Sequence, residues 1–163
     1  MRSPLWIALI VAAPALALPP YASEPAPVLA VPQEDPFTWE IAAPILLQGG
    51  EGRLELRLVV PDGHVAYRDQ LDVQVVDAGP LRAGATDFPP AMVKDDPVTG
   101  RQREQYVDDV VVWVPLKAPK TYEGGVTLVV QTRHQGCRPG VCFPATTIDH
   151  TVLVPVRATT PAG

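Results

Sequence analysis

The sequence predicts an all-β protein, an immunoglobulin-like antiparallel β-sandwich with a long cap loop. Apolar residues recur at every second position in successive segments, which is the period of half-buried strands. Gly- and Pro-containing turns separate these segments, and no comparable window shows helical spacing. We therefore expect about seven short strands in two sheets and very little helix.

The strand-like segments follow one another through most of the chain. They lie at residues 37–41, 54–60, 71–75, 110–114, 126–130 and 148–156. The clearest turns between them contain Gly49-Gly50, Pro61-Asp62-Gly63, Gly124-Gly125 and Pro139-Gly140. Because Gly adopts a positive φ and Pro fixes its own, such turns reverse the chain for antiparallel pairing.

The first residues have the pattern of a cleaved export signal. A basic start, Met1-Arg2, precedes an apolar run from Leu5 to Leu16, and Ala15-Leu16-Ala17 supplies a small-x-small cleavage pattern. A membrane anchor is the alternative, but the run is shorter than the ~20 residues that span a bilayer, and prolines interrupt it. We expect cleavage near Ala17 and no stable membrane insertion afterwards.

After the signal peptide at 1–17, we expect a Pro-rich extended lead-in at 18–36, one folded domain at 37–157 and a flexible tail at 158–163. The chain of 163 residues contains 20 Pro and 12 Gly and has a formal net charge of −5 at pH 7. Nucleic-acid binding relies on positive charge, so this acidity argues against DNA or RNA as a partner.

The two cysteines, Cys137 and Cys142, flank a four-residue turn with Pro139-Gly140 at its centre. In an antiparallel hairpin their Cα atoms would lie ~4.5 to 5.5 Å apart, a separation that a disulfide tolerates. Such a pair in an exported chain is most often a structural staple. Closing so short a loop removes only ~2 kcal/mol of unfolded-state entropy, so we favour a redox-active pair that another protein's sulfur can reach.

Other readings of this region stay open. Arg133, His134 and Arg138 surround Cys137 in sequence and would favour a thiolate, with His134 as a general base or, more commonly, a solvated strand histidine. A zinc or copper site would combine the two cysteines with His134 or His150. The C-x4-C spacing with scattered histidines is a weak signal for metal.

The segment from Phe88 to Tyr106 breaks the alternation with three prolines and dense charge. A segment of this length between strands is either a solvated surface loop or functional. We interpret residues 94–106 as a cap over the cysteines whose mobility controls their access, with Gly100 as the pivot.

Three stretches resemble the family of the N-terminal periplasmic domain of the thiol:disulfide interchange protein DsbD. They are PDGHVAYR at 61–68, YVDDV at 106–110 and QGCRPGVCFP at 135–144. The resemblance implies an immunoglobulin-like domain in the periplasm, with thiol:disulfide interchange activity of the protein-disulfide reductase type. It also implies that Cys142 forms the mixed disulfide, that Cys137 resolves it, and that the site or cap includes Tyr67, Asp95, Asp96 and Phe143.

The resemblance implies partners as well. A membrane-embedded reductase would supply reducing equivalents, and thioredoxin-like or disulfide-isomerase proteins would receive them, with no cofactor. We expect the reductase to be another polypeptide. Two departures concern the cap, where Pro97 and Val98 replace a shielding aromatic residue, and Val65, which replaces a second tyrosine. The alternative function is a non-catalytic immunoglobulin-like binding module with a structural disulfide.

Overall fold

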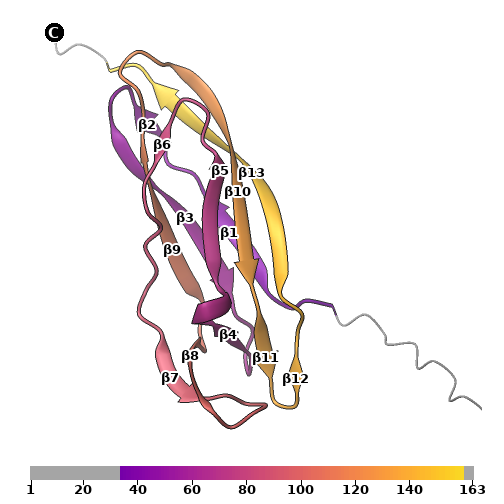
Figure 1. Cartoon of the computed structure of the whole chain (residues 1–163). Coiled ribbons are helices and arrows are strands. Elements are labelled where there is room, and N and C mark those ends of the chain that lie inside the picture. The colour runs from indigo at the N-terminus through magenta and orange to yellow at the C-terminus, as the bar shows by residue number, and fades with distance from the viewer. Residues whose placement is uncertain (1–33, 160–163) are drawn as a thin grey trace, which may run out of the picture. The chain divides into compact units, whose positions relative to one another are not determined.

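The computed structural model describes residues 34–159 (Figure 1). Strands and the segments that connect them make up this range, together with a single 3-10 turn at Arg68–Gln70. No α-helix occurs in this range, as the alternating pattern predicts. Accordingly, none of its helical segments is long or apolar enough to cross a membrane. The expected signal peptide, most of the lead-in and the end of the tail lie outside the described residues.

The described residues contain thirteen strands where about seven were expected, because several pairings involve only two or three residues. The strands are β1 (Thr38–Ala42), β2 (Leu46–Leu47), β3 (Glu51–Val59), β4 (Val65–Tyr67), β5 (Asp72–Asp77), β6 (Arg82–Ala83), β7 (Met92–Asp95), β8 (Gln102–Tyr106), β9 (Val110–Lys117), β10 (Gly124–His134), β11 (Gly136–Arg138), β12 (Val141–Cys142) and β13 (Thr146–Arg157).

Two four-stranded sheets form the predicted sandwich, with the orders β1-β3-β9-β6 and β2-β13-β10-β5. Every pairing within them is antiparallel except that of β13 with β2. Alternate side chains from both sheets meet in one buried core, which includes Leu56 and Val112 from the first sheet and Leu128 and Val154 from the second. The immunoglobulin-like sandwich predicted from the alternation is confirmed.

A third sheet, of order β12-β11-β4-β8-β7, lies at one end of the sandwich and was not predicted. It contains most of the expected cap loop, which is a β-hairpin: Lys94 of β7 pairs with Arg103 of β8. All four residues of β7 are exposed. The period of two in hydrophobicity is therefore absent from this strand, and for that reason the sequence did not reveal that the expected loop is a paired hairpin.

The two cysteines lie on an extension of the longest hairpin in the sandwich. Strand β10 pairs with β13 from Gly124↔Val156 to His134↔Thr146, and the chain then crosses into the third sheet as β11 and returns as β12 (Figure 1). A Cβ on Gly136 would lie 2.1 Å from Cζ of Phe37 and 2.4 Å from the carbonyl oxygen of Val65. Only glycine lets β11 come this close to β4.

Candidate functional site

Cys137 and Cys142 pair directly across β11 and β12 and form a disulfide. Their Cα atoms are 4.0 Å apart, slightly closer than the sequence suggested. Pro139 and Gly140 occupy the turn between them, and the φ of +77° at Gly140 is the positive value that the third position of a type II turn requires. The predicted cysteine hairpin is present.

The two halves of the disulfide differ in exposure. Cys137 is completely buried, whereas Cys142 is an exposed residue at the edge of the third sheet. Thiol–disulfide exchange requires an incoming thiolate to reach one of the two sulfurs. The geometry therefore favours attack on the Cys142 side.

Strand β4 supplies the wall behind the buried cysteine. Val65 and Tyr67 pack with Cys137 in a small cluster, and Val107 lies against it. Cys137 pairs with Val65 in the β11–β4 ladder, which fixes this contact through the backbone. Val65 is only 9% exposed, so it fills apolar space beside Cys137.

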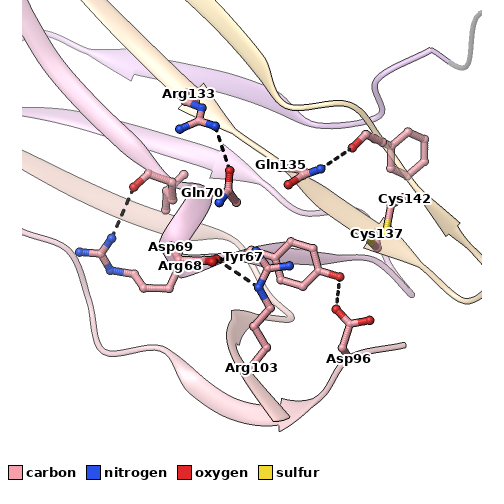
Figure 2. Close-up of polar contacts among 12 residues, drawn as sticks. Tyr67, Arg68, Asp69, Gln70, Asp96, Arg103, Arg133, Gln135, Cys137 and Cys142 are labelled. Atoms are coloured by element: carbon pink, nitrogen blue, oxygen red, sulfur yellow. Dashed lines mark hydrogen bonds and ion pairs between the residues drawn. A yellow bond between two sulfur atoms is a disulfide. The ribbon is translucent and has the colours of Figure 1, made fainter. Parts of the chain in front are cut away.

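The hydroxyl of Tyr67 donates a hydrogen bond to Oδ2 of Asp96, which heads the turn between β7 and β8 (Figure 2). Oδ1 of Asp96 accepts hydrogen bonds from the backbone N–H groups of Val98 and Thr99, at 2.9 and 2.8 Å. The hydrogen bond from Tyr67, aided by these two, lowers the pKa of Asp96 to about 2. Burial, together with Asp96, raises the pKa of Tyr67, so the phenol stays protonated and remains the donor.

Arg103 of β8 holds the other side of Tyr67. Its guanidinium lies 3.6 Å from the centroid of the Tyr67 ring, and its Nη2 is 2.7 and 2.9 Å from the two carboxylate oxygens of Asp69 (Figure 2). The cation on the ring face and the ion pair together join β8 to the 3-10 turn that follows β4. The sequence analysis missed Arg103 and Asp69, because nothing local marks two charges 34 residues apart as partners.

Two other predicted residues lie outside this contact network. Asp95 is exposed, and its carbonyl oxygen, rather than its carboxylate, accepts a hydrogen bond from Nε2 of Gln105. Phe143 is buried beneath the hairpin, with its ring 6.0 Å from Phe37 and 5.6 Å from His64 between centroids. Its N–H donates to the carbonyl oxygen of Gly136, so Phe143 supports the cysteine turn from below.

His134 is fully buried, and the prediction of a solvated strand histidine was wrong. Nε1 of Trp39 donates a hydrogen bond to its Nδ1, and its Nε2 lies 2.8 Å from Oδ2 of Asp35. Both ring nitrogens are thus engaged, which leaves neither free to act as a base for a cysteine. Continuing the period of two from Val126 along β10 places His134 on the buried face, but its partner Asp35, 99 residues away in sequence, could not be predicted from that period.

The structure does not bring together the ligands of the alternative zinc or copper site. The two cysteines share a disulfide, and Nε2 of His150 lies 2.9 Å from Oγ1 of Thr132. Within residues 34–159 no group of three His, Cys, Asp or Glu side chains is arranged to hold a metal ion. The nearby cations Arg133 and Arg138 are exposed, and Arg133 donates to Oε1 of Gln70.

The YVDDV stretch has a structural role. Oδ1 of Asp109 accepts a hydrogen bond from the N–H of Val60, and its Oδ2 pairs with Arg57 at 2.5 Å. These contacts fix the end of β3 to the start of β9. The stretch therefore stabilises the sandwich next to the third sheet, and its Val107 packs against the cluster around Cys137.

The model of one known family, described as thiol:disulfide interchange protein DsbD, N-terminal, matches residues 31–153. The chain belongs to this DsbD N-terminal domain family. No curated protein sequence matches the chain. Among solved structures, the DsbD N-terminal domain of Neisseria meningitidis in its reduced form is 22% identical, with a TM-score of 0.53 over 73% of this chain and 86% of that chain.

A second structure is the complex between the DsbD N-terminal and PilB N-terminal domains of Neisseria meningitidis. It is 21% identical, with a TM-score of 0.54 over 75% of this chain and 86% of that chain. At such identities the two likenesses show a shared fold.

The β7–β8 hairpin of this DsbD N-terminal domain has no aromatic residue in its turn at residues 96–101. Val98, at the position where we expected a departure, is 45% exposed. Tyr67 and Val65 cover Cys137, while Cys142 remains exposed. The cover over the disulfide is therefore partial, and Val65 and Tyr67 of β4 contribute to it.

Proposed function

We propose that this DsbD N-terminal domain exchanges disulfides with other proteins, taking reducing equivalents from a membrane-embedded reductase and passing them to thioredoxin-like or disulfide-isomerase clients. One observation carries the proposal: a disulfide on a short turn has one buried cysteine and one exposed cysteine. A partner's sulfur reaches the exposed Cys142, while Cys137 stays buried and packed against Tyr67.

We further propose the periplasm as its compartment. The family is named for a thiol:disulfide interchange protein, and an oxidising compartment lets a disulfide persist. The export pattern ending near Ala17 supports the same placement, with residues 37–157 as the mature folded domain.

In the reduced protein, the thiolate of Cys142 attacks one sulfur of the client's disulfide. The client's S–S bond breaks, one client thiolate leaves, and a mixed disulfide joins Cys142 to the client. Cys137 then loses its proton and attacks Sγ of Cys142, which releases the second client thiolate and restores the Cys137–Cys142 disulfide. Two electrons and two protons pass to the client, and a dithiol of the reductase reverses the sequence to reload the pair.

The proposed partner is a protein, because a disulfide pair of this kind acts by direct contact between sulfurs. In the Neisseria meningitidis complex a DsbD N-terminal domain is bound to a PilB N-terminal domain, which supports a protein partner for this chain as well. Tyr67 and Asp96 connect the sulfurs to the β7–β8 turn, so the partner meets a surface whose position depends on that hydrogen bond.

A redox titration against glutathione tests the exchange function. We expect a reduction potential above ~−300 mV, since structural disulfides usually lie below that value. A lower potential would favour the binding module with a structural disulfide.

Trapping tests the role of each cysteine. Cys137→Ser should accumulate mixed disulfides with clients, because the resolving thiol is gone, whereas Cys142→Ser should form none. Accumulation of adducts by Cys142→Ser alone would reverse the two roles.

A further inference from the structure

A second concave surface lies away from the disulfide, on the outer face of the sheet β1-β3-β9-β6. Strands β3, β9 and β6 surround a hollow of about 530 Å³ there. Arg53, Arg82 and Lys117 line it, and Pro115 and Gly84 form part of its floor. Strand β9 starts beside the third sheet and reaches this hollow at its other end, so the hollow and the sulfurs lie at opposite ends of the sandwich (Figure 1).

Two cations of this hollow face each other across neighbouring strands. Arg82 and Lys117 are directly opposite each other in the β6–β9 ladder, and like charges in such positions destabilise a sheet. Lys117 has a partner in Glu51, at 2.8 Å, and this ammonium lowers the pKa of Glu51. Among residues 34–159, Arg53 and Arg82 have no carboxylate within ion-pair distance.

A neighbouring hollow of about 330 Å³ extends the positive surface. It shares Arg82 and Lys117 with the first hollow and adds Lys120. The two hollows together, which we call the basic hollow, have four cations and one carboxylate on their walls, an excess of three positive charges. The whole chain has a formal net charge of −5, so this positive surface is opposite in sign to the overall charge of the protein.

Gly84, which has no side chain, leaves space open at the floor of the basic hollow. The N–H of Gly84 donates to the carbonyl oxygen of Pro115 at 2.8 Å, which holds the two residues side by side. A Cβ on Gly84 would lie 3.2 Å from Cβ of Pro115 and would begin to fill the space. The guanidiniums of Arg53 and Arg82 therefore border an open floor rather than a packed one.

We propose that the basic hollow binds a phosphate group, either of a soluble phosphate ester or of a lipid headgroup. A phosphate offers several acceptor oxygens to the planar forks of two arginines, and a doubly charged phosphate offsets more of the positive excess than one carboxylate does. Binding would relieve the repulsion between Arg82 and Lys117, which the free protein bears. This site is separate from the proposed redox function, since none of its residues contacts the disulfide cluster.

The test uses the purified full chain and pyrophosphate as the soluble probe, followed by amide chemical shifts. We expect saturable shifts at Gly52, Gly84 and Lys117. The double variant Arg53→Glu with Arg82→Glu should bind pyrophosphate about tenfold more weakly or worse. Lys94→Glu makes a charge change of the same sign on exposed β7 at the disulfide end and should leave the affinity unchanged.

A flotation assay separates the two sources of phosphate. Selective flotation with phosphatidylcholine vesicles that contain phosphatidylglycerol, lost in the double variant, assigns a lipid headgroup. Pyrophosphate binding without flotation assigns a soluble ester. The proposal is overturned if neither probe binds saturably, if Lys94→Glu weakens binding as much as the double variant, or if polyglutamate binds as tightly as pyrophosphate.

Misfolding of the variant does not obscure the result. Arg82→Glu places a carboxylate opposite Lys117 and so replaces a like-charge pair by an opposite-charge pair. Arg53 is exposed and pairs with Pro115, so its replacement removes no ion pair. Thermal unfolding of both single variants should match or exceed that of the parent, and either single variant then serves for the binding measurement.

Discussion

The hydroxyl of Tyr67 lies 2.5 Å from Oδ2 of Asp96, and both side chains are buried. This hydrogen bond joins β4, which packs against Cys137, to the turn of the β7–β8 hairpin. The position of the hairpin and the environment of the disulfide are therefore linked through two side chains.

Tyr67→Phe should lower the free energy of unfolding by about 1–3 kcal/mol, because the buried carboxylate of Asp96 loses a donor. Urea denaturation measures the change. Tyr106→Phe is the matched control: its hydroxyl also donates, at 2.7 Å, but to the neutral carbonyl oxygen of Pro89. A smaller loss for Tyr67→Phe than for Tyr106→Phe would contradict the importance of the Asp96 contact.

The same contact predicts a dependence of stability on pH. The hydrogen bond from Tyr67 lowers the pKa of Asp96 from 3.8 to about 2, so the folded state favours the carboxylate. The contribution of the Asp96 carboxylate to the free energy of unfolding is fully present above the unfolded pKa. It is lost as the pH falls from about 3.8 through about 2. Asp96→Asn should flatten the stability curve in this window, whereas the exposed Asp95→Asn should leave it as in the parent.

Reduction of the disulfide should leave the fold intact and cost no more than about 2 kcal/mol, the entropy term for so short a loop. The β11–β4 pairing and the contact of Cys137 with Tyr67 do not depend on the S–S bond. Denaturation with and without reductant measures the difference. Global unfolding on reduction alone would show that the disulfide is a structural staple.

Shortening the hairpin from Asp96 to Gln102, with Asp96 included in the deletion, should raise the rate at which a small thiol reduces the disulfide, because it removes the partner of Tyr67 that holds the hairpin in place. Exchange with a protein client should slow or lose selectivity, since part of the contact surface is gone. Stopped-flow kinetics with dithiothreitol and with a thioredoxin-like protein give the two rates. If the small thiol reacted no faster, the hairpin would not limit access.

Gly136→Ala should destabilise the third sheet by about 1–3 kcal/mol or more, because the new methyl group meets the Phe37 ring and the Val65 carbonyl oxygen. Gly125→Ala is the control, since its methyl group would meet only the end of the exposed Leu153 side chain, at 3.0 Å. Chemical denaturation compares the two. Equal losses would show that β11 can move away from β4 at little cost.

The sequence could predict those elements that depend on neighbours along the chain. Strands with one buried face, such as β9, show the alternation directly, and Pro139-Gly140 marks the cysteine turn by its own backbone preferences. The resemblance to the family also led to Tyr67 and Asp96, which the structure brings together.

The remainder depends on contacts between distant segments. Strand β7 has no buried face, so its pairing with β8 leaves no periodic signal. The Arg103–Asp69 ion pair and the burial of His134 against Asp35 join residues far apart in the sequence. A single sequence does not show which charge meets which, and these side chains were consequently missed or misjudged.

The direct pairing of Cys137 with Cys142 also bears on how long any complex lasts. Once a mixed disulfide joins a partner to Cys142, the free thiol of Cys137 lies directly opposite it in the β11–β12 ladder. The pairing of Cys137 with Val65 of β4 holds it in this position. A nucleophile confined so close has an effective molarity far above that of any dissolved thiol. In the proposed exchange, covalent complexes of the parent protein should therefore be short-lived, and the turnover of a client should be limited by how often the two proteins meet.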